Sequence, residues 1–117
     1  YHPFLGQKTL QPMLREAGMA LTAYCPLAQG RVFESETLKT IADKHGKNPG
    51  QVALRWLIQQ DGVVAIPRSS REEHASANID IFDFELSQQE MGEIAGLADP
   101  QGRVINPEGL APSWDVD

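Results

Sequence analysis

The chain has 117 residues, of which 41% are hydrophobic, so it is long enough for one domain with its own core. Its formal charge of −6 at pH 7 argues against nucleic acid or a membrane surface as a partner. Cys25 is the only cysteine, which excludes an internal disulfide, offers no zinc-type cluster and fits a reducing, cytoplasmic location. We expect no bound metal ion.

The first half of the chain predicts two helices on either side of one strand. Residues 8–17 carry apolar side chains at helical spacing, and a glycine follows as a stop signal. Residues 19–24 have the pattern of a short buried strand, which a proline closes before the loop CPLAQGRVF. Ser35 is placed as the N-cap of a helix that ends at Gly46.

The second half predicts three more helices, one strand and an irregular tail. An Asn-Pro cap begins a helix over residues 48–62, whose apolar stripe should face the core. Residues 63–66 form a continuous apolar run, typical of a strand covered on both faces. Further helices are expected over residues 71–79 and 87–97, the latter with a Ser-x-x-Glu capping box. Residues 99–117 are rich in Pro, Gly and Asp, and we expect no regular structure there.

Strands that alternate with helices in this order indicate βαβ units and therefore a parallel α/β sheet. Three strands at most would leave both edges of such a sheet exposed. The chain also begins at YHPFLG without an initiator Met. We therefore expect a piece of a larger fold.

The segment IPRSSREE has the composition of an anion site. In α/β folds, ligands bind at the carboxyl ends of the strands, and Arg68, Ser69 and Ser70 directly follow such an end. Arginine suits bidentate contact with phosphate, and the next helix would direct its positive end at the same place. The alternative is purely structural: a serine caps the helix, Arg71 pairs with a glutamate, and Arg68 is a solvated charge.

Three motifs in order resemble the C-terminal half of the aldo-keto reductases, a (β/α)8 TIM-barrel family that uses NADPH. PRSSREEHASAN is similar to the family pattern of Pro, Lys or Arg, Ser or Thr, four residues, Arg, and later Asn. YHPF resembles the end of barrel strand 6, and TAYCPLAQG resembles the end of strand 7. The resemblance implies that residues 1–98 belong to the barrel, that residues 99–117 are its tail, and that the N-terminal half lies outside this chain.

The resemblance also implies roles for individual residues. Tyr24 matches the aromatic residue that stacks on the nicotinamide, and Trp114 is expected either in the substrate pocket or packed against the barrel. The remaining expected NADPH-binding positions are Cys25, Leu27 and Gln29 near the pyrophosphate and ribose; Ile66, Arg68, Ser69 and His74 around the adenosine 2′-phosphate; Ala77 and Asn78 beside the adenine; and Ser70 and Arg71 as additional contacts.

No catalytic residue is expected in this segment, because the family's catalytic Asp, Tyr, Lys and His come from earlier strands. His2 matches a different motif and is interpreted as structural. The intact enzyme is expected to transfer a hydride from NADPH to a carbonyl carbon. The tail INPEGLAPSWD is similar to that of bacterial members that reduce 2,5-diketo-D-gluconate and small 2-oxoaldehydes such as methylglyoxal.

His74 stands where the family pattern has Arg, which replaces a permanent bidentate cation by a ring whose charge depends on pH. We expect a weaker preference for NADPH over NADH as a result. Two other interpretations remain open: a non-catalytic, NADPH-binding regulatory subunit of the same fold, and a self-sufficient binding module that folds alone.

Overall fold

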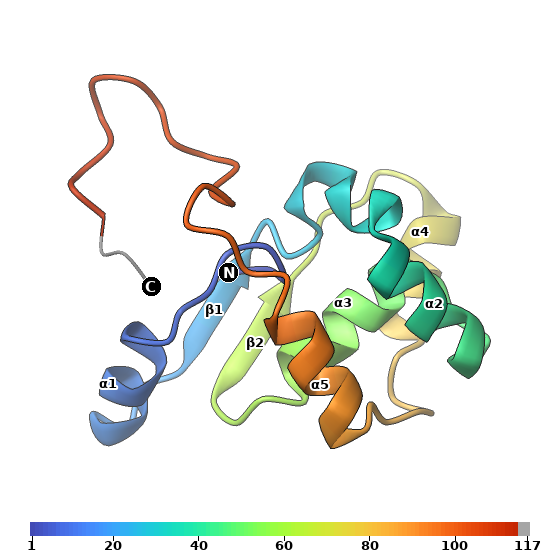
Figure 1. Cartoon of the computed structure of the whole chain (residues 1–117). Coiled ribbons are helices and arrows are strands. Elements are labelled where there is room, and N and C mark those ends of the chain that lie inside the picture. The colour runs from blue at the N-terminus through green and yellow to red at the C-terminus, as the bar shows by residue number, and fades with distance from the viewer. Residues whose placement is uncertain (115–117) are drawn as a thin grey trace.

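The computed structural model describes residues 1–114. Helices and two strands alternate along the chain, as the sequence predicts (Figure 1). In order, the elements are α1 (Leu10–Glu16), β1 (Leu21–Tyr24), the 3-10 helix η1 (Ala28–Glu34), α2 (Glu36–His45), α3 (Pro49–Ile58), β2 (Val63–Ile66), α4 (Glu72–Ile79) and α5 (Gln88–Ala95).

The predicted helix caps are confirmed. The Ser35 hydroxyl accepts a hydrogen bond from a backbone N–H in the first turn of α2, and Gly46 ends that helix with φ of 64°, a conformation that favours glycine. Asn48 begins α3 within a full capping box. Ser87 and Glu90 form the predicted box at α5, with bonds of 3.1 and 2.9 Å. These caps fix where the helices begin and therefore how the loops between them run.

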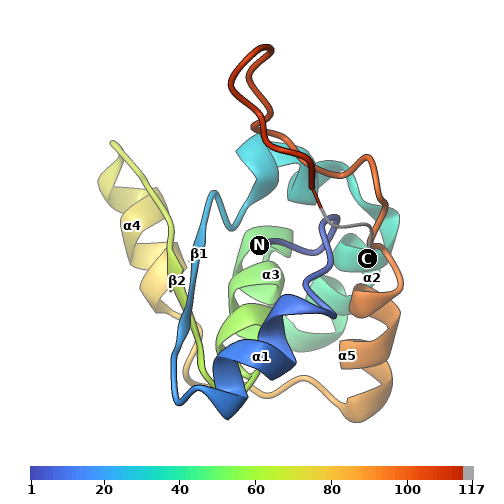
Figure 2. The same cartoon turned by 90° about the vertical axis from the view of Figure 1, so that its left-hand side faces the viewer.

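The two strands pair in parallel, with Leu21 opposite Val63 and Tyr24 opposite Ile66. Only alternate residues are buried, because α2, α3 and α5 all lie on one side of the sheet (Figure 2). The expectation that β2 is covered on both faces is therefore wrong for this chain: Val64 and Ile66 are 50% and 56% exposed.

Helix α3 forms the centre of the core, as its apolar stripe predicts. Val52, Leu54 and Leu57 are fully buried, and Trp56 is nearly so. The indole Nε1–H of Trp56 donates a hydrogen bond of 3.2 Å to the Met91 carbonyl oxygen, which ties α3 to α5.

Some local predictions differ from the structure. The loop CPLAQGRVF, expected to be irregular, contains η1, in which two short turns meet at a kink. Such turns close by i to i+3 bonds and show no apolar periodicity that a sequence would reveal.

Helices α3 and α5 end before residues 62 and 97. Residues 1–5 form a turn with an isolated bridge between His2 and Leu5 rather than a strand that joins the sheet. Helix α1 buries none of its residues.

The tail has no helix or strand over residues 99–114, as predicted, but it packs against the N-terminal turn. The Asp99 N–H donates to the Phe4 carbonyl oxygen at 3.1 Å. A Cβ on Gly102 would lie 1.6 Å from that same oxygen, so only glycine fits there. Over the described residues, no helix has the length and apolar character needed to cross a bilayer.

Candidate cofactor and substrate site

Tyr24 and Ile66 are the last residues of their strands and partners in the sheet. Because the two strands end at directly paired residues, the loops after β1 and β2 leave the sheet at the same height. Partners on neighbouring strands lie on the same face, and both side chains are more than half exposed on the face that the helices leave open. This edge is where parallel α/β folds bind ligands.

The loop after β1 is strained. Cys25, Ala28 and Gln29 have φ between 48° and 54°, and they are the non-glycine residues with positive φ among residues 1–114. Side chains other than glycine adopt this left-handed region at an energetic cost. Strain of this kind concentrates at ligand sites, where the backbone is shaped for contact. Three of the predicted cofactor positions, Cys25, Leu27 and Gln29, lie in this loop.

The loop after β2 carries one unpaired cation. Arg68 is exposed and has no ion pair or hydrogen bond with another residue among 1–114, and the same holds for the Ser70 hydroxyl. The Ser69 hydroxyl is occupied locally, because it donates to the Arg71 carbonyl oxygen and accepts from the Arg71 N–H. Arg68 is therefore the basic side chain most available to an anion here.

Helix α4 begins beside this loop without a side-chain cap. Arg71 is the N-cap residue, and no side chain accepts from the first-turn N–H groups. Neither serine caps the helix, whereas the predicted alternative of an Arg71 ion pair is seen: its guanidinium contacts Glu73. The Nε2 of His74 lies 3.9 Å from the same carboxylate. An uncapped helix start attracts anions, while Glu73 opposes them.

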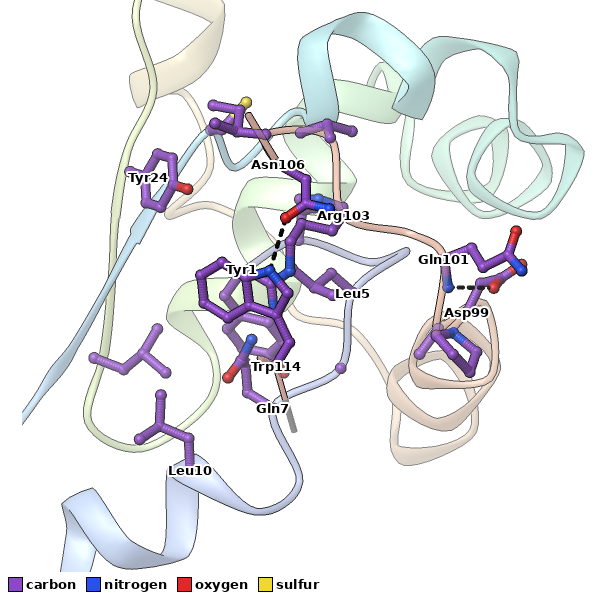
Figure 3. A pocket seen from close by; sticks show the side chains of 18 of the residues that line it. Tyr1, Leu5, Gln7, Leu10, Tyr24, Asp99, Gln101, Arg103, Asn106 and Trp114 are labelled. Carbon is purple, nitrogen blue, oxygen red and sulfur yellow. Dashed lines mark hydrogen bonds between the residues drawn. The ribbon is translucent and has the colours of Figure 1, made fainter. Parts of the chain in front are cut away.

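A cavity of about 650 Å³ lies beside β1. Residues of the N-terminal turn, of β1 and of the tail line it together, and Figure 3 shows these three segments around it. Tyr24, Cys25 and Trp114 all contribute to its wall. The structure thus brings together the residue predicted beside the nicotinamide, Tyr24, one residue predicted near the pyrophosphate and ribose, Cys25, and the predicted substrate residue, Trp114.

Two contacts hold Trp114 in this wall. Its Nε1–H donates a hydrogen bond of 2.7 Å to the Asn106 Oδ1, and the guanidinium carbon of Arg103 lies 3.6 Å from the centroid of its ring. The interpretation of Trp114 as a residue packed on the barrel stays open, but the contacts seen here come from the tail itself. Arg103 and Asn106 were not identified from the sequence, where only a lone basic residue in a Pro- and Gly-rich tail hinted at them.

His2 lies in the same wall and is almost fully buried. Neither ring nitrogen has a hydrogen-bond partner among the described residues. Burial, and to a lesser extent the nearby positive charges of the N-terminal amine, Arg31 and Arg103, lower the pKa of His2 to about 4. The ring is therefore neutral at pH 7, as suits a wall residue.

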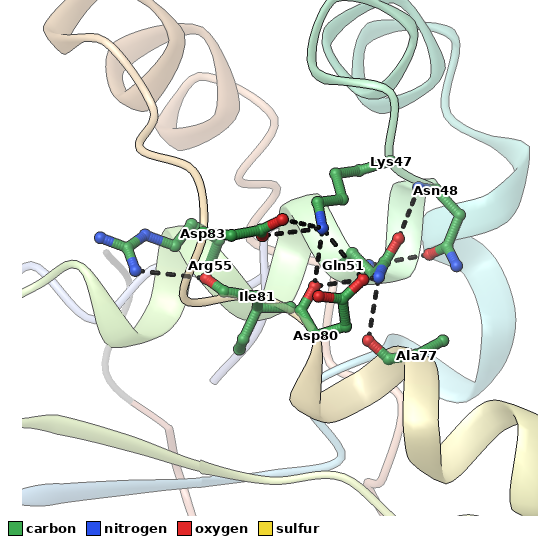
Figure 4. Close-up of polar contacts among 8 residues, drawn as sticks. All are labelled: Lys47, Asn48, Gln51, Arg55, Ala77, Asp80, Ile81 and Asp83. Atoms are coloured by element: carbon green, nitrogen blue, oxygen red, sulfur yellow. Dashed lines mark hydrogen bonds and ion pairs between the residues drawn. The ribbon is translucent and has the colours of Figure 1, made fainter.

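A polar network fixes α4, which carries several predicted site residues, to the body of the molecule (Figure 4). The buried Gln51 amide donates to the backbone carbonyls of Ala77 and Asp80, both at 3.0 Å. Lys47 contacts the carboxylates of Asp80 and Asp83 at 3.1 and 2.8 Å. The network therefore holds the C-terminal end of α4 while leaving its first turn open.

The predicted site residues fall into two groups in the structure. Tyr24 and Cys25 line the cavity with Trp114. The other positions lie outside its wall, on η1, at the end of β2 and on α4: Leu27, Gln29, Ile66, Arg68, Ser69, Ser70, Arg71, His74, Ala77 and Asn78. The two groups lie next to each other at the ends of β1 and β2, where Tyr24 pairs with Ile66.

Known proteins resemble this chain in sequence. The sequence model of the Aldo/keto reductase family matches residues 1–99. Glyoxal reductase of Bacillus subtilis (strain 168) is 44% identical over 110 residues, which cover 94% of this chain and 40% of that protein. Aldose reductase B of Dictyostelium discoideum is 45% identical over 98 residues, which cover 82% of this chain and 31% of that protein.

Solved structures are similar as well. A crystal structure assigned as a 2,5-diketo-D-gluconic acid reductase B superposes with a TM-score of 0.94 at 44% identity, over 98% of this chain and 41% of that one. A mutant of Gox0644 in complex with NADPH superposes with a TM-score of 0.84 at 32% identity, over 88% of this chain and 38% of that one.

Parallel strands with helices packed on one side, together with the similarity to the solved reductase structures, define this chain as part of a (β/α)8 barrel. The chain belongs to the aldo/keto reductase family, as the motif PRSSREEHASAN predicts. It spans between 31% and 40% of the length of the two relatives named above.

Proposed function

We propose that this chain is the cofactor-binding, C-terminal part of an NADPH-dependent aldo-keto reductase. In this proposal residues 1–98 complete a barrel whose other strands lie outside the chain, and residues 99–117 form its tail. The partner of the exposed sheet face is then the N-terminal half of the same barrel. The measured mass of the natural protein tests this division, because a polypeptide of 12.9 kDa would contradict it.

The level pairing of Tyr24 and Ile66 is the observation that carries the proposal. It sets the cavity beside Tyr24 and the basic loop at Arg68 along one edge, as an extended dinucleotide requires. In this reading the ring of Tyr24 stacks on the nicotinamide, the strained loop follows the pyrophosphate and ribose, and Arg68 binds the 2′-phosphate.

The residues present fit NADPH, with one clear strong point and one weak point. Arg68 is unpaired within residues 1–114 and keeps its donors for a phosphate. The uncapped start of α4 adds free backbone N–H groups, which also attract a phosphate. Arg71 fits less well, because Glu73 already occupies its guanidinium. Ser69, Ser70, His74, Ala77 and Asn78 complete the proposed adenosine end of the site.

When bound, NADPH would supply a hydride to a carbonyl carbon. The proposed substrates are 2,5-diketo-D-gluconate, which would be reduced to 2-keto-L-gulonate, and small 2-oxoaldehydes such as methylglyoxal. The names of the similar glyoxal reductase and 2,5-diketo-D-gluconic acid reductase B support this choice. Trp114 would contact the substrate from the tail, while the proton-donating groups would come from the rest of the barrel.

Binding of NADPH and NADH to the full reductase, before and after Arg68→Gln, tests the cofactor part of the proposal. Loss of a charged phosphate contact should weaken NADPH binding about 10- to 100-fold and change NADH binding little. Arg15→Gln, an exposed arginine of α1, is the matched control and should change neither. Equal losses for both cofactors would contradict a role for Arg68 at the 2′-phosphate.

The same preparation separates an enzyme from a regulatory subunit. A reductase should consume NADPH, followed by its absorbance, when methylglyoxal or 2,5-diketo-D-gluconate is added. A protein that binds NADPH tightly but oxidises it with neither substrate would favour the non-catalytic alternative.

A further inference from the structure

We infer that Arg103 binds the carboxylate of an anionic substrate, and that the cavity beside Tyr24 therefore selects acidic sugars and 2-oxo acids over neutral carbonyl compounds. The inference rests on the proposed reductase function, which it refines by assigning a residue that distinguishes anionic from neutral substrates. Arg103 lies on the tail and contributes to the cavity wall.

The contact with Trp114 holds the guanidinium of Arg103 in place. Its carbon lies 3.6 Å from the ring centroid, which is van der Waals distance from the ring face. Trp114 is itself fixed by the 2.7 Å hydrogen bond to Asn106. A guanidinium held through its face keeps the N–H donors along its edge, in the fork that matches a carboxylate. Trp114 thereby preorganises Arg103 without using its hydrogen-bonding capacity.

Within residues 1–114, the charges around Arg103 leave its guanidinium available to an anion. Among residues 1–114 no carboxylate lies within ion-pair distance of it, and it makes no hydrogen bond to another of these residues. Asp99 is the acidic side chain that lines the cavity, and its Oδ1 accepts the Gln101 N–H at 2.7 Å. Figure 3 shows Asp99 well separated from Trp114. His2, in the same wall, is uncharged at neutral pH.

Arg31 shows what a purely structural arginine looks like in this region. Its guanidinium lies over the Phe4 ring, 5.0 Å from the centroid, and donates a hydrogen bond of 3.5 Å to the Gly102 carbonyl oxygen. Arg31 does not line the cavity. The two arginines therefore both contact aromatic rings, but of the two only Arg103 contributes to the cavity wall.

The test compares two substrates of the full reductase that differ in charge. For Arg103→Gln, kcat/KM with 2,5-diketo-D-gluconate should fall about 10- to 100-fold, mainly through KM, because a charged hydrogen-bonded contact is lost. With methylglyoxal, which is neutral, kcat/KM should change less than about threefold. Arg103→Lys should retain part of the preference for the acid, and Arg31→Gln should leave the ratio between the two substrates unchanged.

A parallel loss with both substrates, or no loss with the acid, would overturn the inference. If the wild-type protein reduces neither compound, the proposed function fails, and calorimetric binding of D-gluconate and D-glucose then decides on Arg103 alone. The inference requires that D-gluconate binds more tightly than D-glucose and that Arg103→Gln removes this difference. Equal binding of the two sugars would refute it.

Discussion

His74 is an exposed side chain in the first turn of α4. Among residues 1–114, the only carboxylate in contact with it is that of Glu73, whose Oε1 lies 3.9 Å from the His74 Nε2. It stands where relatives of this family are expected to carry arginine. An arginine could bind a 2′-phosphate through two parallel hydrogen bonds, whereas imidazole offers one nitrogen in that direction.

We predict that His74→Arg raises the ratio of kcat/KM for NADPH to that for NADH by about tenfold, which corresponds to roughly 1.4 kcal/mol of added phosphate recognition. Steady-state kinetics of the full reductase with both cofactors measures this ratio. An unchanged ratio would mean that His74 lies outside the phosphate site, and the exposed Lys39→Arg should leave the ratio as it is.

Glu90 is a buried carboxylate whose charge stabilises the fold. Burial raises its pKa, but hydrogen bonds from Ser87 and the contact with His45 outweigh this effect and lower the pKa below its ordinary value of 4.5. A carboxylate with a lowered folded-state pKa adds stability above pH 4.5. This contribution disappears as the pH falls through the folded-state pKa.

We therefore predict that Glu90→Gln, which preserves the shape of the capping box, lowers the free energy of unfolding at pH 7 by about 1 kcal/mol. Its stability should then decline less between pH 5 and pH 3 than that of the wild type, measured by urea denaturation across this range. Glu93→Gln serves as control, because Glu93 is exposed. Parallel curves for Glu90→Gln and the wild type would contradict the prediction.

At the scale of secondary structure, Gln51 links α3 to the end of α4 from a buried position. Its amide bonds two carbonyls of the α4 end, and its Oε1 accepts the Asn48 N–H at 3.0 Å. No part of this side chain is among the proposed NADPH contacts. Its effect on the cofactor would therefore come through the position of α4.

We predict that Gln51→Leu lowers the free energy of unfolding by about 2–3 kcal/mol, since two buried hydrogen bonds and part of a cap are lost. NADPH binding should weaken in the same variant under conditions where it is still folded, as judged by circular dichroism. Gln88→Leu, on the exposed start of α5, should affect neither quantity. Full NADPH affinity in the folded Gln51→Leu protein would show that α4 needs no such support.

The sequence predicts those elements that depend on neighbours along the chain. The caps at Ser35, Asn48 and Ser87 are local patterns, and the helices begin where these residues predict. The contact of Arg103 with Trp114 could not be predicted, because it depends on how an irregular tail folds back. The strained backbone at Cys25 likewise follows from tertiary packing rather than from local preference.

At the scale of the whole molecule, the sheet presents one open face. Tyr24, Val64 and Ile66 are each at least half exposed there, and both strands of the sheet are edge strands. In the proposed barrel this face is covered by the remaining strands. On the isolated chain it is an apolar surface of the kind that drives association.

We predict that the 117-residue chain, produced alone, self-associates with rising concentration in sedimentation velocity experiments. Combining Val64→Thr with Ile66→Thr should weaken this association, because threonine keeps the strand preference but removes apolar surface. Phe82→Thr is the control, since Phe82 is even more exposed, at 69%, but lies outside the sheet. A monomer at all concentrations would favour a self-sufficient module over a barrel segment.

The level register of β1 and β2 also limits how the length of this chain can vary. One residue inserted into either strand would move its end by about 3.3 Å relative to its neighbour and turn the following side chains to the opposite face. In the proposed function, Tyr24 and Arg68 could then no longer contact the same cofactor molecule. Length changes between residues 63 and 68 are therefore incompatible with the proposed cofactor site.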